Sequence, residues 1–289
     1  MNPMRSYLSL LLLTVLLSSC SLNKLVIRQS SRLLDYGALA LYEETDLRLA
    51  EQALASNIIL LEGMVKGDPE NPKLVLLTTQ ALAGYALGFA EDSSPERARV
   101  FYLRARDLGL TILKQNQRFA KALNGPVEEL QKAVQNFKKK DIPLLFWTGF
   151  SWAGWINLSL NDPQAFADLP KIQIIMQRVL DLDQTYFNGA TLLFFGSIWG
   201  VKPKMFGGDP EKAREFFEKN LQITKGTFLL SYIYYVKYYA IKTLDEELFD
   251  QLIDKVMTTP VDVLPEYRLL NVIAKEKAQG LLSKKADIF

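Results

Sequence analysis

The sequence predicts an all-α protein, a tetratricopeptide-like helical repeat solenoid with inserted loops and about ten to twelve helices. Three observations support this fold class. Large and small apolar residues recur at helical spacing along most of the 289 residues, several segments begin with a capping residue followed by Pro, and strand signals are nearly missing.

The first element is a short apolar segment that ends in the only cysteine of the chain. Arg5 precedes an apolar run over residues 8–17, and two serines lead directly to Cys20. This layout is typical of a secretory signal, since a membrane span needs about 20 apolar residues. With its cysteine it resembles a bacterial lipobox, so residues 1–19 are expected to be removed and Cys20 acylated. An ordinary signal peptide with an incidental Cys20 is the alternative.

The mature chain, residues 20–289, is expected to form one exported helical domain. A single acyl chain binds a membrane only marginally, so several chains are expected on Cys20. Ser21, rather than Asp, follows Cys20. By analogy with bacterial lipoproteins, this residue favours the periplasmic face of the outer membrane.

The helices that follow are predicted as pairs. In a tetratricopeptide unit, bulky and small residues alternate in the first helix, and an A-x3-F spacing follows in the second. In chain order, the copies use Leu34, Gly37, Ala38 and Leu41 with Ala50 and Leu54; Leu82, Tyr85, Ala86 and Phe89 with Ala98, Tyr102 and Ala105; Trp147, Phe150, Ser151 and Gly154 with Ile172 and Met176; Leu192, Phe195, Gly196 and Trp199 with Ala213 and Phe217; and Tyr232, Tyr235, Val236 and Tyr239 with Leu248, Leu252 and Pro260.

Helix starts within these pairs are marked by capping residues. Ser94-Pro95-Glu96 and Asp209-Pro210-Glu211 each place Pro in the first turn after a capping side chain. Apolar residues at i, i+3, i+4 and i+7 mark any buried helix face, so a non-repeating helical bundle stays an alternative.

Three interruptions of the repeat are predicted to lie on a binding face. Residues 117–143 add a helix or two, and residues 161–171 and 200–210 are read as insertions. Loops inserted in a helical solenoid gather on one face, which is often the face that binds.

Composition excludes several classes of function. The chain has no His, and Cys20 is expected to be acylated, so neither a Ser-His-Asp or Cys-His site nor a His-based zinc site can form. No cofactor, metal or disulfide is expected. Removal of residues 1–19 takes away Arg5, one of 34 basic residues, and leaves 33 against 32 acidic ones. This balance argues against a nucleic-acid partner.

Several segments resemble one family. They are the lipobox and the stretches FWTGFSWAGWINLSLND, ADLPK, LDQTYFNGATLLFFGS, KPKMFGGDPEKAREFFEKNL, YYVKYYAIKTLDEELFDQLIDKV and LLNVIAKEKAQGLLSKKADIF. Together they resemble the T-component lipoproteins associated with TRAP transporters (TatT-like). The resemblance covers nearly all of the mature chain. It implies an apolar channel or cavity, a homo-oligomer such as a trimer, and a periplasmic substrate-binding P component as partner.

A ligand cavity is expected on the inner face of the first helices. Inner-face positions include Leu193, Ser197 and Ile233, and aromatic residues there suggest a lined cavity. An aromatic residue at helical spacing is more often core packing than a ligand site, and that is the alternative for each of them. The candidate cavity residues are Trp147, Phe150, Trp152, Trp155, Phe195, Trp199 and Lys237, the last of which could neutralise a carboxylate. The candidate partner loop is Lys202, Pro203, Lys204, Met205, Phe206, Gly207, Gly208 and Asp209.

The leading hypothesis is a non-enzymatic periplasmic lipoprotein that handles a hydrophobic or organic-acid ligand for a TRAP-type importer. One alternative is a scaffold lipoprotein for outer-membrane or envelope assembly, with an open peptide groove rich in polar side chains. A carboxylate-based hydrolase acting on the cell wall is a third class.

Overall fold

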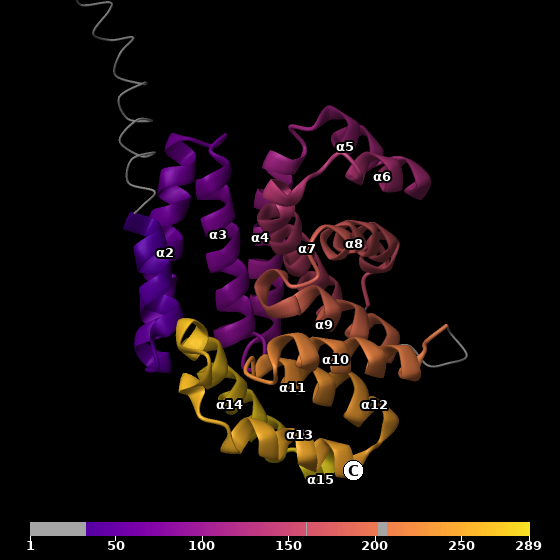
Figure 1. The fold of residues 1–289 in the computed structure, drawn as a ribbon. Coiled ribbons are helices and arrows are strands. Elements are labelled where there is room, and N and C mark those ends of the chain that lie inside the picture. The colour runs from indigo at the N-terminus through magenta and orange to yellow at the C-terminus, as the bar shows by residue number, and fades with distance from the viewer. Residues whose placement is uncertain (1–32, 160, 202–206) are drawn as a thin grey trace, which may run out of the picture.

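The computed structural model describes residues 33–159, 161–201 and 207–289, and within them the chain forms helices and no strand (Figure 1). Residues 33–43 are helical and lead into fourteen numbered α-helical elements. The all-α prediction is therefore confirmed. The predicted number of ten to twelve helices is too low.

The first part of the chain consists of long helices joined by short turns. Two of them, α3 and α4, pack side by side, and a π-helical turn, η1, extends α3 (Figure 1). The bounds are α2 Leu47–Gly67, α3 Pro72–Tyr85, η1 Ala86–Ala90, α4 Pro95–Leu113, α5 Gln117–Ala122 and α6 Val127–Val134.

The middle of the chain contains the two helices richest in aromatic residues. Helix α7 packs on both α4 and α8, and α9 packs on α10. The bounds are η2 Lys139–Asp141, α7 Ile142–Asn157, α8 Pro163–Leu182, α9 Tyr186–Val201 and α10 Pro210–Thr224.

The last part is built from shorter pieces and includes a second π-helical turn, η4. The bounds are α11 Leu230–Tyr235, η4 Val236–Ala240, α12 Ile241–Thr243, α13 Glu246–Thr258, η5 Val261–Val263, η6 Pro265–Tyr267, α14 Arg268–Leu282 and α15 Lys285–Ile288. Helix α14 returns to pack against α2, so the last part of the chain contacts the first (Figure 1).

Capping side chains fix six of the helix starts, those of α2, α3, α5, α8, α10 and α13. Asn71 precedes Pro72 and accepts from the backbone of Lys73 and Leu74, and Asp209 accepts from the backbone of Lys212. The predicted starts at Ser94 and Asp209 are both observed, although the Ser94 side chain makes no capping hydrogen bond. At these starts Pro costs no hydrogen bond, because the first N–H groups of a helix lack an intrahelical acceptor.

Small residues let neighbouring helices approach closely. A methyl group at Gly154 of α7 would lie 2.7 Å from the Tyr102 ring of α4, and one at Gly196 of α9 would lie 2.8 Å from the Phe217 ring of α10. The predicted repeat copies contain all four residues. The large and small residues of the pattern are therefore packed against each other across helix pairs.

Two apolar clusters form the core and meet in the centre. One is built mainly from α2 to α8, and the other mainly from α10 to α14. Leu41, Phe89, Phe187 and Trp199 pack against both clusters. These four residues therefore join the two parts into one packed body.

The predicted insertions differ in outcome. Residues 117–143 contain the extra helices α5 and α6, as expected. The insertion expected at residues 161–171 is wrong, because Asp162 caps a continuous helix that begins at Pro163. Part of the insertion at 200–210 lies outside the described residues. The tetratricopeptide-like solenoid stays a prediction.

Within the described part of the chain, one helix, Pro72–Ala90, is long and apolar enough by itself to cross a membrane, with a mean hydropathy of 1.2. However, 61% of this window is buried inside the protein. Burial of this kind is typical of a core helix, and α3 indeed packs against α2, α4 and α7.

Candidate functional site

A largely apolar cavity of about 240 Å³ lies between the two core clusters. Helices α3, α4, α7, α8, α9, α11 and α14 and both π-helical turns contribute to its wall or its rim. The lining residues are Tyr42, Gly84, Leu87, Glu91, Tyr102, Trp147, Phe150, Ala153, Gly154, Ile156, Asn157, Phe166, Leu169, Ile172, Phe187, Ala190, Leu193, Phe194, Ser197, Ile198, Val201, Phe228, Leu230, Tyr234, Tyr238 and Leu270.

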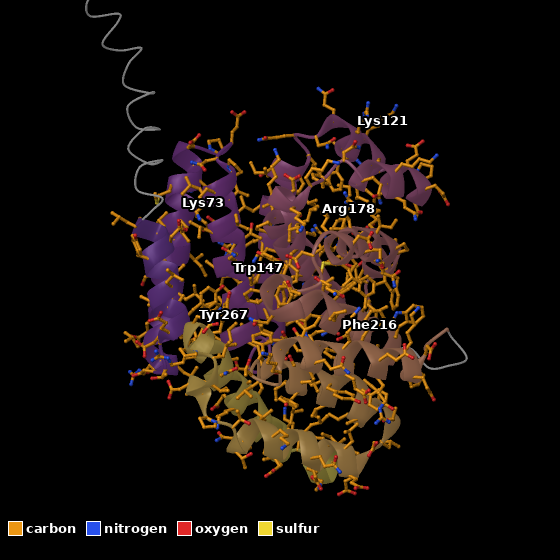
Figure 2. The ribbon with its side chains drawn as sticks, viewed as in Figure 1. Lys73, Lys121, Trp147, Arg178, Phe216 and Tyr267 are labelled. Carbon is orange, nitrogen blue, oxygen red and sulfur yellow. The ribbon has the colours of Figure 1, made fainter. Side chains whose placement is uncertain are left out.

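Aromatic rings form one wall of this cavity. Trp147 lies in the middle of the molecule (Figure 2), and its ring centroid is 4.8 Å from that of Phe187 in an edge-to-face arrangement. The Phe187 ring also makes edge-to-face pairs with Phe228 and Tyr267, with ring centroids 6.2 and 5.6 Å apart. Such edge-to-face pairs favour a fixed geometry, so this wall is preformed.

Phe187 reaches this position through an unusual backbone. Phe187, Asn188 and Gly189 all have positive φ, at 47°, 55° and 65°. Left-handed backbone is costly for residues with a Cβ, and here the buried Asn220 amide supports it by donating to the carbonyl oxygens of Asn188 and Gly189 at 2.8 and 2.9 Å. The strained turn therefore directs an aromatic side chain into the cavity wall.

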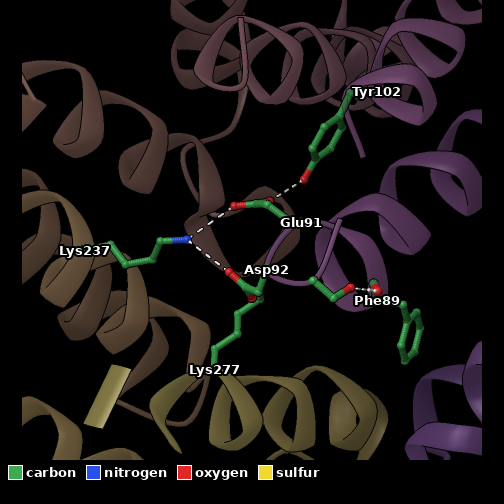
Figure 3. Close-up of polar contacts among 7 residues, drawn as sticks. Phe89, Glu91, Asp92, Tyr102, Lys237 and Lys277 are labelled. Carbon is green, nitrogen blue, oxygen red and sulfur yellow. Dashed lines mark hydrogen bonds and ion pairs between the residues drawn. The ribbon is translucent and has the colours of Figure 1, made fainter. Parts of the chain in front are cut away.

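The lining becomes polar and charged at Glu91, which lies directly after η1. Its carboxylate accepts a hydrogen bond from the Tyr102 hydroxyl at 2.8 Å and pairs with the Lys237 ammonium at 3.3 Å (Figure 3). Asp92 lies 3.8 Å from the same ammonium and also pairs with Lys277 of α14. This group links the first part of the chain to η4 and α14.

The titration of this group follows from burial and charge. Burial lowers the pKa of Lys237, but the neighbouring Glu91 and Asp92 charges outweigh it, so the pKa is raised. Burial and the Glu91 charge raise the pKa of Tyr102, and burial raises the pKa of Tyr238 to about 12. The phenols therefore stay neutral, and the ammonium stays charged, across the physiological pH range.

The predicted cavity residues of α7 fall into two groups. Trp147 and Phe150 line the cavity, whereas Trp152 and Trp155 do not. The Trp152 indole donates to Asp168 at 3.1 Å, and the Arg106 guanidinium lies over both rings, 5.3 Å from Trp152 and 4.8 Å from Trp155. Trp152 follows Trp147 by five residues, which is about 140° around a helix, so the two rings face different neighbours.

The residues predicted on α9 and η4, which are Phe195, Trp199 and Lys237, also lie on helix faces that do not line the cavity. Phe195 stacks on Phe216 at 5.6 Å, while its neighbours Leu193, Phe194 and Ser197 line the cavity. Trp199 receives the Lys212 ammonium 3.9 Å from its ring centroid. Lys237 does not line the cavity, and its ammonium group pairs with Glu91 and Asp92.

The predicted partner loop is described only at its end. Lys202, Pro203, Lys204, Met205 and Phe206 lie outside the described residues. Gly207 has a φ of 82°, and Gly208 leads to the cap residue Asp209, whose backbone N–H donates to the Trp199 carbonyl at 3.2 Å. This bond fixes the end of the loop beside α9.

Several lining residues were not predicted from the sequence. Glu91 follows the end of a first helix, Tyr234 and Tyr238 are one turn apart beside Lys237, and Phe187 directly precedes the turn signal Asn188-Gly189. These signals were available. They indicate turns and helix ends, and only the fold brings them to one cavity.

A second apolar cavity of about 310 Å³ lies next to the first. Tyr42, Gly84 and Leu270 line both. Tyr42 is held edge-to-face against Tyr267 at 5.2 Å, and burial raises its pKa. A neutral aromatic ring therefore stands between the two cavities.

Metal-binding chemistry finds no support in the described residues. They contain no group of three or more His, Cys, Asp or Glu side chains close enough to hold a metal ion. The wall of the cavity is suited to an apolar guest rather than to acid and base chemistry.

Comparisons with known proteins agree with this picture. A family model described as "TRAP transporter T-component" matches residues 43–289. An uncharacterized protein of Treponema pallidum (strain Nichols) is 22% identical over 263 residues, which cover 86% of this chain and 81% of that protein. Since the family match spans nearly every helix described above, the chain belongs to the TRAP transporter T-component family.

Proposed function

We propose that the protein is a lipid-anchored periplasmic T component that binds the substrate-binding P component of a TRAP transporter and holds an apolar ligand in its central cavity. Cys20 would be the anchor, and residues 1–19 the signal that is removed. In this role the protein is a non-enzymatic accessory of transport, in agreement with its family.

The observation that carries this proposal is the aromatic cavity itself. Ligand sites in proteins are mostly apolar hollows with few polar groups, and this wall is largely apolar, with Tyr102, Tyr234 and Tyr238 grouped near Glu91. The scaffold alternative requires an open groove rich in polar side chains. The apolar lining supports ligand handling over peptide display.

Handling of a ligand can be tested by filling the cavity. Ala153 lines it, so Ala153→Phe should reduce the affinity for N-phenyl-1-naphthylamine, a neutral apolar fluorophore, by about tenfold. Ala120→Phe on α5, away from both apolar cavities, is the matched control and should leave the affinity unchanged. Equal affinity of both variants and the wild type would remove the cavity as the ligand site.

Binding to the P component needs a separate measurement. Native mass spectrometry of the delipidated protein mixed with its cognate P component should detect a complex. The mass of the free protein gives its oligomeric state, which the family resemblance leads us to expect as a trimer. Absence of any complex at micromolar concentration would contradict the proposed partner.

A further inference from the structure

The one formal charge in the wall of the described cavity is negative. Among the lining residues only Glu91 carries a charge at neutral pH. Its side chain is 11% exposed, and its backbone N–H donates to the Ala86 carbonyl at 2.8 Å, which closes the π-helical turn η1. The carboxylate is therefore placed by the backbone and not by a flexible loop.

The contacts of Glu91 leave it able to accept further hydrogen bonds. One carboxylate oxygen accepts from the Tyr102 hydroxyl, and the other faces the Lys237 ammonium. A carboxylate offers about four acceptor positions. Two protein donors therefore leave acceptor capacity at the polar end of the cavity.

The nearby cations are already engaged with protein carboxylates. Lys237 pairs with Glu91 and Asp92, and Lys277 pairs with Asp92 (Figure 3). Neither lysine lines the cavity. An anionic ligand would therefore lie beside the Glu91 carboxylate. The two neighbouring ammonium groups are already paired with Glu91 and Asp92.

Two phenols stand in the same part of the wall. Tyr234 and Tyr238 are adjacent on one face of α11 and η4, with ring centroids 5.6 Å apart, and both line the cavity. Burial and the Glu91 charge keep their pKa values raised, so both stay neutral. They can donate or accept a hydrogen bond, but they add no positive charge.

We infer that Glu91 is the specificity-determining residue of the cavity and selects apolar ligands that end in a neutral or cationic hydrogen-bond donor, such as an alcohol or an amine, over carboxylates. This inference rests on the proposed function and names the class of its ligand. It also means that Lys237 serves to hold Glu91 in place instead of binding a ligand carboxylate.

The experiment uses three probes with the same apolar chain. Octan-1-ol, octylamine and octanoate displace N-phenyl-1-naphthylamine from the wild-type protein at neutral pH, below their micelle concentrations. Octanol and octylamine should each bind about tenfold or more tightly than octanoate, because both can donate to the Glu91 carboxylate, whereas octanoate has no donor and brings a second carboxylate beside it. Equal affinities, or a preference for octanoate, would overturn the inference while leaving the apolar cavity as a binding site. Failure of the fluorophore and all three probes to bind would overturn the cavity function as well.

A matched pair of variants assigns the selectivity to one residue. Glu91→Gln keeps the shape and removes the charge, so the octanol-to-octanoate preference should fall to about threefold or less. Glu96→Gln, on α4 with a side chain that is 88% exposed, should keep the wild-type preference. Thermal unfolding checks that both variants are folded. An unchanged preference in folded Glu91→Gln protein would contradict the assignment. If neither variant folds, the three probes on the wild-type protein still test the inference.

Discussion

Single buried amides hold together segments that have no regular backbone partner. The Asn271 side chain on α14 is fully buried; it accepts from the Leu229 backbone at 2.9 Å and donates to the carbonyls of Thr227 and Val261 at 3.1 and 3.2 Å. Asn220 likewise donates to two backbone carbonyls, those of Asn188 and Gly189, in the left-handed turn at the start of α9. Each amide satisfies backbone groups that would otherwise be buried without a partner.

Truncation of Asn271 should therefore be costly. Asn271→Ala removes three hydrogen bonds and leaves buried backbone groups unpaired, so the free energy of unfolding should fall by about 2–4 kcal/mol. Urea denaturation followed by circular dichroism measures this loss. Asn136→Ala, at an exposed position, should change the free energy of unfolding by less than about 0.5 kcal/mol. A small effect at Asn271 would show that water replaces the amide.

The ion pair between Asp92 and Lys277 predicts a response to acid. Burial raises the pKa of Asp92, but Lys277 and Lys237 outweigh it, so the pKa lies below 3.8 in the folded protein. The stabilisation from this group is present above pH 3.8 and is lost as the pH falls through the lower folded value.

Asp92→Asn should therefore lose less stability than the wild type on acidification to about pH 3. Because Asp92 is half exposed, the difference should be about 1 kcal/mol or less. Urea midpoints at neutral pH and at about pH 3 measure it. The exposed substitution Asp287→Asn serves as control. Parallel behaviour of wild type and Asp92→Asn would contradict a depressed pKa.

At the scale of elements, helix pairs are held by glycines that face large rings. Gly154 of α7 lies under Tyr102, which is buried and hydrogen-bonded to Glu91, so the ring has little freedom to move away. Gly63 of α2, in contrast, has open space around it. The same substitution should therefore have opposite effects at these two positions.

Gly154→Ala should destabilise the protein by about 1–3 kcal/mol because the new methyl group overlaps the Tyr102 ring. Gly63→Ala should stabilise it by up to about 1 kcal/mol, since alanine is the better helix former. Guanidinium denaturation of both variants provides the comparison. A stabilised Gly154→Ala protein would show that α4 and α7 can separate without cost.

Helix pairing was predictable at this scale, whereas helix rotation was not. The spacing of Leu192, Gly196 and Phe217 identified the pair α9 and α10, because a small residue facing a large one has a local signature. The same spacing did not distinguish the cavity face, which carries Phe194, from the face that carries Phe195. Both residues are aromatic, and only the neighbouring helices decide which one meets the cavity.

Some features have no local signature at all. The π-helical turns η1 and η4 lie in the middle of longer helical runs, and neither turn contains a Pro that would mark it in the sequence. The pairing of Glu91 with Lys237 joins residues 146 apart. Such contacts follow from the closed arrangement of the chain, so the charge of the cavity could not be predicted.

At the scale of the whole molecule, the predicted lipid anchor and the helical body should be separable. Cys20 lies outside the described residues, and the described helices from residue 33 onward pack into core clusters of their own. Cys20→Ala should therefore move the protein from the membrane fraction to the soluble fraction with an unchanged melting temperature. The same variant should lower transport when the P component is scarce, because the tether provides a high local concentration.

Fractionation and thermal unfolding check the first part of this prediction, and substrate uptake at graded P-component levels checks the second. A lower melting temperature would contradict the separation of anchor and body. Retention of the variant in the membrane fraction would contradict the role of Cys20.

The return of α14 to the start of the chain has a consequence for how the protein forms. Lys277 and Asp92 are 185 residues apart, so their contact closes a long loop, whereas helix pairs such as α9 and α10 form locally. Local contacts form faster than those that close long loops. The helix that brings Leu270 to the cavity should therefore dock late, and a guest present during folding in the periplasm could be enclosed as the last wall arrives.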